Sequence, residues 1–318
     1  MADGGLFVYS SARDAHEQIT RLSDFISPTI IAMWNLRWQV QGFVSAHPEA
    51  SQSDLVSRFA LGSGVRGNEI KRACIDNTWA DQEARFAAIL LTNTISIFEE
   101  FAERLVGITL HGDRKRKASK ALQYPNSTDG RGYQSAYSTL GTPVPELRGV
   151  FNDPSRHGRW YSGHCLQNLL LCFRFFKEMR NTLSHSGGRA TPELIDAYNA
   201  FLPIATILDL GVKEIPAHSA PVLDKRIDLD LRGVNGFSNI ILRIIATYDT
   251  DLSDRESAKS DIQRRLGSIQ GAARGHIDKI KKEKRIRGLL TNANLPFATL
   301  TPSFLNFLRS TDRIPDYW

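Results

Sequence analysis

Cysteine is scarce in this chain, and long apolar runs are missing from it. The three cysteines, Cys74, Cys165 and Cys172, are too few for a disulfide framework, and no Cys-x-x-Cys pair indicates zinc. No stretch approaches the roughly 18 to 20 consecutive apolar residues that a membrane-spanning helix needs. The first residues lack a basic segment followed by an apolar one, so we expect no secretory signal. These absences predict a soluble cytoplasmic protein with no membrane partner.

The motifs of several large enzyme classes are missing as well. The chain has no Walker loop, no Rossmann glycine fingerprint, no serine-hydrolase motif and no His-Glu-x-x-His helix. The glycines of residues 61–67 follow a helix-like run and not a strand, so they do not predict a phosphate-binding loop. Polar or turn-rich surroundings predict a surface position for five histidines: His16, His47, His157, His218 and His276. We therefore expect neither a metal nor another cofactor.

Basic residues, in contrast, are in excess. Lys and Arg number 40 against 34 Asp and Glu, and the formal net charge is +6. Arginine accounts for 28 of the 40, and its planar guanidinium suits bidentate contacts with phosphate. The excess favours polyanionic partners such as nucleic acid. Apolar residues make up 42% of the chain, which is enough for a packed core and excludes wholesale disorder.

Hydrophobic periodicity is helical almost throughout, so the sequence predicts a mainly α fold. Strand-like alternation is short and scattered. Thr191 is expected to cap a helix in which Pro192 is the first residue, and Ser253 with Asp254 is expected to open the last long helix. The predicted helices span residues 51–59, 68–73, 85–106, 162–184, 192–202, 237–248 and 253–284.

Composition divides the chain into three parts. Residues 1–80 are predicted to form an N-terminal helical module, in which the turn at 61–67 separates two short helices. That arrangement is loosely like a helix-turn-helix, or it is simply two packed helices. Residues 81–212 are predicted to form a helical domain with a polar insertion at 111–161, which is either an ordered excursion or a functional loop. Residues 213–318 are predicted to form a basic C-terminal helical region.

Two basic runs are candidates for contact with a polyanion. One extends from residue 279 through residue 287. The other continues to Lys120 and contains the predicted substrate-binding residues, which are Arg114, Lys115, Arg116 and Lys117. Each run is either a solvated face or an electrostatic track for a phosphate backbone, whose binding would weaken as salt rises.

One arginine stands among apolar residues near the end of a predicted helix. At about 100° per residue, Arg180 falls within the stripe formed by Leu166, Phe173, Phe176 and Leu183. A guanidinium that faces the buried side is costly unless it is paired or engaged by a ligand. Gly187 and Gly188 are expected to stop this helix.

Three further polar residues lie beside that stripe. Glu178, Asn181 and His185 fall within about 60° of one another on its flank. Histidine is the usual general acid or base, and arginine is the usual partner for charge that develops on a phosphate. The set therefore indicates metal-independent RNA cleavage, in which the ribose 2′-OH attacks the adjacent phosphate.

The segment from Arg180 to His185 resembles the Arg-x(4–6)-His signature of the HEPN superfamily (higher eukaryotes and prokaryotes nucleotide-binding). The resemblance extends over about residues 85–210 and implies a compact helical bundle. It also implies a homodimer, in which Arg and His of both subunits build one ribonuclease cleft. By this resemblance Arg180 binds phosphate, His185 is the catalytic acid or base, and Asn181 and Glu178 are supporting polar groups. Many prokaryotic relatives serve in toxin or antiviral defence, which implies an RNA target and an antitoxin or other regulatory partner.

Two other interpretations stay open. In one, the chain is a non-catalytic helical protein that binds nucleic acid or another partner and uses the HEPN-like bundle for dimerisation. In the other, the segment is structural: Arg174 pairs with Glu178 one turn on, and His185 merely caps the helix end. An acidic residue of a second helix, for example Glu99 or Glu103, then makes Arg180 a buried ion pair. Position 187, where some HEPN toxins carry a modified tyrosine, is Gly187 here, so that form of regulation is disfavoured.

Overall fold

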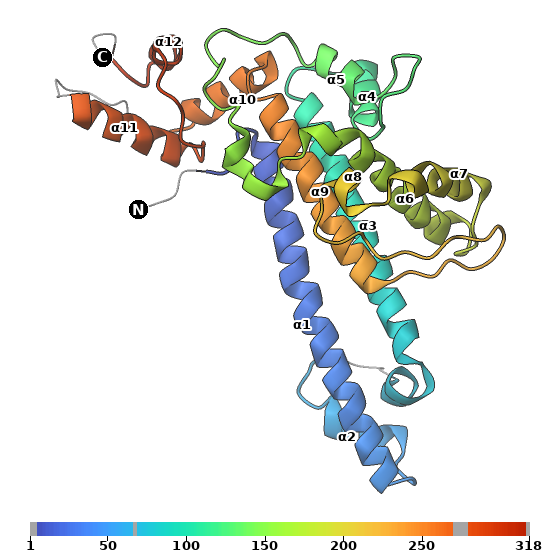
Figure 1. Ribbon diagram of the computed structural model, residues 1–318. Coiled ribbons are helices and arrows are strands. Elements are labelled where there is room, and N and C mark those ends of the chain that lie inside the picture. The colour runs from blue at the N-terminus through green and yellow to red at the C-terminus, as the bar shows by residue number, and fades with distance from the viewer. Residues whose placement is uncertain (1–4, 66–68, 270–278, 316–318) are drawn as a thin grey trace.

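The computed structural model describes residues 5–65, 69–269 and 279–315, with residues 279–281 described by their backbone alone, and it is mainly helical (Figure 1). The predicted fold class is thereby confirmed. Within the described ranges no strand forms, and the β-type contacts are two isolated bridges, Pro143 with Arg255 and Arg189 with Arg226. No helix in those ranges combines the length and the apolar character that crossing a bilayer requires.

Three long helices form the centre of the molecule: α1 (Ser10–Ala46), α3 (Trp79–Val106) and α9 (Leu231–Asp251). A fourth helix, α6 (Leu166–His185), lies against α3 and α9 (Figure 1). Aromatic side chains fill the interface, because the apolar faces of α3 and α6 carry phenylalanines at helical spacing and α9 contributes Phe237. The rings of Phe98 and Phe173 are 4.8 Å apart, and those of Phe176 and Phe237 stack at 4.6 Å.

Shorter elements surround this centre. α4 and α5 lie over one end of α3, and α7 packs on α6 (Figure 1). α10, α11 and α12 follow α9 on the other side of the body (Figure 1). The remaining elements are α2 (Gln52–Phe59), η1 (Arg72–Asp76), α4 (Gly112–Ala121), α5 (Tyr133–Thr139), η2 (Pro154–Trp160), η3 (Gly163–Cys165), α7 (Pro192–Phe201), η4 (Leu202–Ile204), α8 (Ile207–Leu210), α10 (Glu256–Gly267), α11 (Lys279–Asn292) and α12 (Pro302–Ser310).

Helix starts follow the capping chemistry at some positions and depart from it at others. The Thr191 hydroxyl accepts a hydrogen bond from the Leu194 amide with Pro192 in the first turn, which confirms the predicted start of α7. The predicted start at Ser253 is wrong, since α10 begins at Glu256. The hydroxyl of Ser253 is buried and donates to the Thr250 carbonyl, so it is used in the turn that follows α9.

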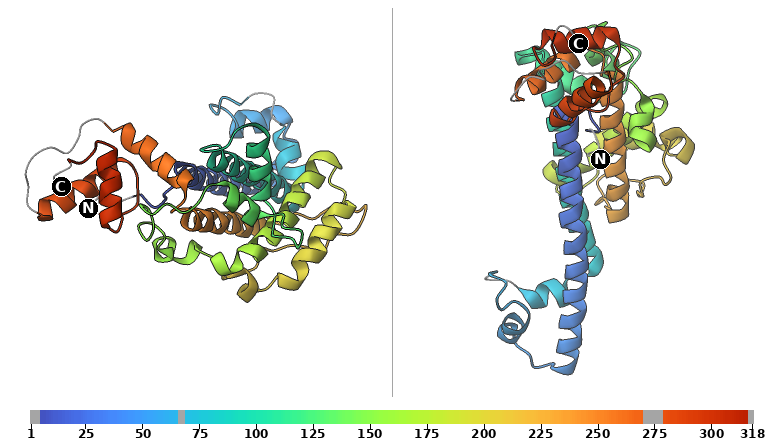
Figure 2. Two further views of the ribbon diagram at one scale, coloured as in Figure 1. Left: turned by 90° about the horizontal axis from the view of Figure 1, so that it is seen from above. Right: turned by 90° about the vertical axis from the view of Figure 1, so that its left-hand side faces the viewer.

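The N-terminal 80 residues are divided between two hydrophobic cores. Phe7, Val8 and Tyr9 belong to the main core together with the side chains of α3, α6 and α9. The far end of α1 projects from the body and carries α2 and η1 against it (Figure 2). The second core lies there and is small; its fully buried members are Val40, Leu55, Ile70 and Cys74. The predicted helix at 68–73 begins outside the described residues, and the structure has a π-helical turn at Arg72–Asp76.

The insertion at 111–161 is an ordered excursion. It contains α4, α5 and η2, and it contributes to the main core through Leu122, Leu140, Leu147 and Phe151, which are all buried. On the C-terminal side, α9 belongs to the centre of the bundle although it comes after residue 212. The bundle that holds α6 therefore draws on residues both inside and outside the range 81–212.

The predicted surface position of His157 is wrong. Its side chain is fully buried, and its Nε2 lies 3.1 Å from Oδ2 of Asp249. The same carboxylate accepts hydrogen bonds from the Val8 and Tyr9 amides at 3.1 and 2.8 Å and from Arg156 at 2.8 Å. The sequence could not show this, because Asp249 is 92 residues from His157 along the chain.

The other histidines differ in their exposure. His47 is exposed, in agreement with the prediction. His16 and His218 are half-buried against aromatic rings, His16 beside Phe7 at 5.3 Å and His218 beside Phe201 at 5.1 Å. His276 lies outside the described residues.

Candidate functional site

The C-terminal end of α6 is defined by two glycines in the left-handed region. Gly187 and Gly188 have φ angles of 59° and 76°, which glycine adopts without steric cost. The amides of Ser186 and Gly188 both donate to the Thr182 carbonyl, at 3.0 and 3.1 Å. The chain thus closes the helix as the sequence predicts and turns toward α7.

Arg180 points from α6 toward α3 and forms an ion pair there. Its Nη2 lies 3.1 Å from Oε1 and 3.0 Å from Oε2 of Glu99. The arginine side chain is 18% exposed and that of Glu99 is 30% exposed, so the pair is largely covered. The partner is Glu99, one of the two acidic residues that the sequence named, and Glu103 one turn further along α3 is exposed.

The same carboxylate holds a second cation. Lys177 Nζ lies 2.6 Å from Oε1 of Glu99 and also donates to the side chain of Gln123, which follows α4. Burial lowers the pKa of Lys177, while the hydrogen bond to Glu99 acts in the opposite direction. One carboxylate therefore faces two cationic side chains, and this group of three carries a net positive charge.

The guanidinium of Arg180 is held from one side. Both contacts to Glu99 use Nη2, whereas Nε is buried without a hydrogen-bond partner. No hydrogen bond to Nη1 forms within the described part of the chain. Glu99 thus fixes the orientation of the guanidinium, and of the nitrogens that it does not contact only Nη1 is not buried.

Glu178 and Asn181 belong to a neighbouring ridge of α6. The Asn181 amide donates to Oε2 of Glu178 at 2.9 Å, and Arg174 pairs with the other oxygen, Oε1. The guanidinium of Arg174 also lies over the ring of Tyr124, 4.2 Å from its centroid. This second network is close to neutral, and it joins α6 to the segment that follows α4.

His185 continues that ridge one turn beyond Asn181. It is the last residue of α6, and its side chain is exposed. The imidazole has no hydrogen bond or ion pair with any residue that the structure describes. Of the four predicted catalytic residues, the structure brings Glu178 and Asn181 into contact, places Arg180 in a separate pair with Glu99, and leaves His185 open to solvent.

The predicted substrate-binding run lies on α4. Arg114, Arg116 and Lys117 are exposed and Lys115 is partly buried. Arg116 pairs with Asp113 at 3.1 Å, where both side chains are about four-fifths exposed, so the pair adds little to stability. Most of the positive charge on α4 therefore has no carboxylate partner among the described residues.

A cavity of about 720 Å³ opens at the C-terminal end of α4. Lys117, Lys120 and Arg131 line it, together with the ring of Tyr124. Arg131 is paired with Asp129, whose pKa the arginine and the Ser127 hydroxyl hold well below its usual range. Tyr124 links this cavity to Arg174 of α6, so the basic helix and the α6 residues are neighbours.

The second basic run is only partly described. The side chains of residues 279–281 are outside the described part, and from Lys282 onward they lie on α11. Arg287 pairs with Glu283 at 2.7 Å across one helical turn. The pair offsets one of the positive charges that the sequence assigned to this run.

Sequence reasoning missed the residues that link these parts. Lys177 and Gln123 join α6 to the end of α4, and the ring of Tyr124 lies under Arg174. Spacing along α6 could have indicated Lys177, because it precedes Arg180 by three positions and shares its ridge. Gln123 and Tyr124 carry no such signal, since their contacts join residues about 50 positions apart in the chain.

Comparison of the chain with protein-family models, with curated proteins and with solved structures found no match. Within the described residues, no group of three or more His, Cys, Asp or Glu side chains is placed to hold a metal ion. No family is therefore shown for this chain, and the resemblance to the HEPN superfamily rests on the sequence from Arg180 to His185 alone.

Proposed function

We propose that this chain is a metal-independent endoribonuclease of HEPN type that acts as a homodimer. The end of α6 carries the proposal. There, an exposed histidine follows the Glu178–Asn181 pair on one ridge, beside an arginine whose guanidinium is held by Glu99 at Nη2 alone. These are the residue types that phosphodiester cleavage needs, within three turns of one helix.

In the proposed reaction the ribose 2′ oxygen attacks phosphorus, and the bond from phosphorus to the 5′ oxygen breaks. One imidazole takes the 2′ proton and a second one protonates the leaving 5′ oxygen. Nη1 of Arg180, which Glu99 does not use, faces the charge that develops on the phosphate and helps to neutralise it. The products are a 2′,3′-cyclic phosphate and a 5′-hydroxyl end, and DNA is not cut because it lacks the attacking group.

A second copy of the chain is part of this proposal. The structure records no contact between His185 and Arg180 within one chain, and the reaction needs both an acid and a base. Two α6 ends that meet across a twofold axis supply two imidazoles and two guanidiniums. Roles in toxin or antiviral defence, and an antitoxin or regulatory partner, are proposed from the resemblance alone.

The basic surface of α4 supports RNA as the substrate class. It carries Arg114, Lys117 and Lys120 in exposed positions and joins α6 through Tyr124 and Arg174. A single-stranded backbone that follows α4 thus reaches the flank of α6. Binding through such contacts weakens steeply as salt concentration rises.

The ion pair between Arg180 and Glu99 favours a second candidate, a non-catalytic nucleic-acid-binding protein. This pair accounts for the largely covered guanidinium without any substrate. In that case α6 serves packing and dimerisation, and the surface of α4 alone binds RNA. The two candidates differ in one measurable respect, which is whether bound RNA is cut.

The test uses purified full-length protein and 5′-end-labelled RNA in the presence of a chelator, beside DNA of the same sequence. We expect cleavage of RNA alone, with 2′,3′-cyclic phosphate ends. His185→Ala should lower the cleavage rate by about 10²-fold or more, because the general acid or base is lost. His47→Ala, which removes another exposed histidine, should cut like the unmodified protein.

Circular dichroism and size-exclusion chromatography control for misfolding and for loss of the dimer in His185→Ala. RNA that binds in a salt-sensitive way without being cut would support the second candidate. A strict requirement for a divalent metal, or full activity of His185→Ala, would contradict the proposed mechanism.

A further inference from the structure

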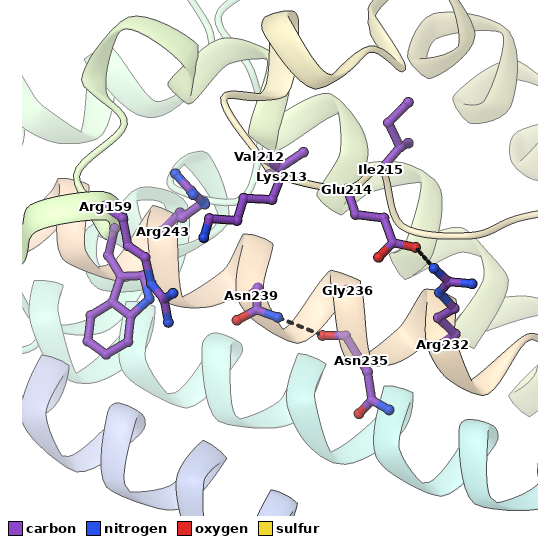
Figure 3. Close-up of a pocket in the computed structure, with 11 residues that line it drawn as sticks. Arg159, Val212, Lys213, Glu214, Ile215, Arg232, Asn235, Gly236, Asn239 and Arg243 are labelled. Carbon is purple, nitrogen blue, oxygen red and sulfur yellow. Dashed lines mark hydrogen bonds and ion pairs between the residues drawn. The ribbon is translucent and has the colours of Figure 1, made fainter.

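A second cationic cavity lies on another part of the molecule, between η2, the connection that follows α8, and α9 (Figure 3). Its volume is about 390 Å³. None of its lining residues belongs to α4 or α6. The residues that line it are Arg159, Trp160, Val212, Lys213, Glu214, Ile215, Arg232, Asn235, Gly236, Asn239 and Arg243.

The charges in this cavity are unbalanced. Glu214 pairs with Arg232 at 2.6 Å, at one end of the cavity. The side chains of Arg159, Lys213 and Arg243 gather toward the other end (Figure 3). Within the described residues none of these three cations has a carboxylate partner. Three positive charges thus share a partly enclosed space with no counter-charge of their own.

Arg243 is the most covered of these cations. Its Nη1 donates to the Ser162 hydroxyl at 2.8 Å, which fixes the guanidinium in place. Burial lowers the pKa of Arg243, and the positive charge of Arg159 lowers it further. Like charges that are held close together in this way repel one another, and an anion bound between them would relieve the repulsion.

The connection that follows α8 packs closely on α9, and this packing places Lys213 beside α9. Gly233 and Gly236 of α9 meet the connection directly. A Cβ at position 233 would lie 1.9 Å from the carbonyl oxygen of Ala217, and one at position 236 would lie 3.1 Å from Cα of Pro216. Two glycines one turn apart therefore allow the connection to pack on the helix, and this approach brings Lys213 over the cavity.

The residues of this cavity other than its cations suit an organic group that is attached to a bound anion. Trp160, Val212 and Ile215 supply apolar surface, and Trp160 is partly exposed. Asn239 donates to the backbone carbonyl of Asn235 at 3.3 Å, and its exposed amide oxygen remains as an acceptor (Figure 3). A cavity lined by an aromatic ring, an amide and several cations can receive a nucleobase and its phosphate.

We propose that this cavity binds a phosphate monoester carried on a nucleoside. Arg159, Lys213 and Arg243 hold the phosphate, and Trp160 with Asn239 receives the nucleoside. Two sources share this chemistry, a free nucleoside monophosphate and the 5′-phosphorylated end of an RNA. The site is independent of the ribonuclease proposal, because it shares no residue with it.

The test is isothermal titration of the full-length protein with adenosine 5′-monophosphate, inorganic phosphate and adenosine. We expect the monophosphate to bind more tightly than either of its parts. Lys213→Ala and Arg159→Ala should each weaken its binding about tenfold, since each removes one charge-assisted contact. Lys225→Ala removes an exposed lysine outside this cavity and should bind like the unmodified protein.

A 5′-phosphorylated RNA oligonucleotide and its 5′-hydroxyl counterpart identify the source. If the phosphorylated RNA binds more tightly than adenosine 5′-monophosphate, and Lys213→Ala removes that advantage, the natural ligand is an RNA end. If the mononucleotide binds more tightly than the RNA, the natural ligand is a free nucleotide. Adenosine that binds as well as the monophosphate, or variants that bind like the unmodified protein, would overturn the proposal. His185→Ala should leave the binding of adenosine 5′-monophosphate unchanged. The ribonuclease proposal is tested by RNA cleavage, so it can fail while this proposal holds.

Discussion

Glu99 is the residue on which the two interpretations of α6 diverge. Its carboxylate is 3.0 Å from Arg180 and 2.6 Å from Lys177, so two cations share one counter-charge. A carboxylate that only neutralises an arginine makes a structural pair. A carboxylate that orients an arginine and leaves other donors unused prepares it to bind an anion. Substitutions at both ends of the pair separate these roles.

Glu99→Gln should lower the free energy of unfolding by about 1–2 kcal/mol, because two largely covered cations lose their shared partner. Chemical denaturation measures this change, with Glu103→Gln as the exposed control on the same helix. A double-mutant cycle of Glu99→Gln with Arg180→Ala should give a coupling energy of about 0.5–3 kcal/mol. If the two substitutions change the free energy of unfolding additively, the pair of Glu99 with Arg180 contributes nothing to stability.

Arg180→Lys keeps the charge but loses the planar guanidinium. If Arg180 binds phosphate, this variant should keep most of its stability and lose most of its cleavage activity, since the single ammonium of lysine cannot pair with Glu99 and also extend a second nitrogen to the phosphate. Thermal unfolding and the RNA cleavage assay are measured on the same preparation. Normal cleavage by Arg180→Lys would assign Arg180 to packing alone.

At the level of elements, the end of α6 determines where His185 lies. Gly187 has a φ of 59° with open space around its Cα, so only the backbone conformation opposes a side chain there. Gly187→Ala should lower the free energy of unfolding by about 1 kcal/mol, because alanine is strained in the left-handed region. Gly187→Asn should cost less, since asparagine tolerates that conformation. Urea denaturation compares the two, and equal stabilities would contradict this account of the helix end.

The start of a helix and its buried face could be predicted from the sequence where the residues that define them are neighbours in the chain. Thr191 and Pro192 define the start of α7 within three residues, and the phenylalanines of α6 show its buried face directly. The start of α10 was not predictable, because Ser253 caps nothing and is used by the preceding turn. Arg180 could be identified as needing a partner, but the choice of Glu99 over Glu103 depends on how α3 and α6 are rotated against each other.

Over the whole molecule, Asp249 joins three distant parts of the chain. It accepts hydrogen bonds from the Val8 and Tyr9 amides, from Arg156 of the insertion and from His157. Burial alone would raise the pKa of Asp249, but the His157 hydrogen bond and the Arg156 charge outweigh it and hold the pKa below its ordinary value of 3.8. No local pattern predicts this cluster, because the Val8 contact is 241 positions from Asp249.

Asp249 should therefore make the fold sensitive to acid. A carboxyl with a lowered folded-state pKa contributes stability that is fully present above its unfolded pKa and is lost as pH falls through the folded value. Asp249→Asn should cost about 3 kcal/mol at pH 7, because Arg156 is left covered without a counter-charge. The difference from the unmodified protein should shrink as pH falls below about 4, measured by urea denaturation at several pH values. Asp24→Asn, at an exposed position, is the control, and a difference that stays constant with pH would contradict the prediction.

The projecting end of α1 has a consequence for how the molecule unfolds. Among the described residues, the second core has four buried side chains with partly buried neighbours, far fewer than the main core has. So small a core can offset little of the conformational entropy lost on ordering this part of the chain. We therefore expect the tip to unfold at a lower free energy than the body, as a separate cooperative unit. If so, a single melting temperature should not describe the molecule: hydrogen exchange should show lower protection in α2 than in α9.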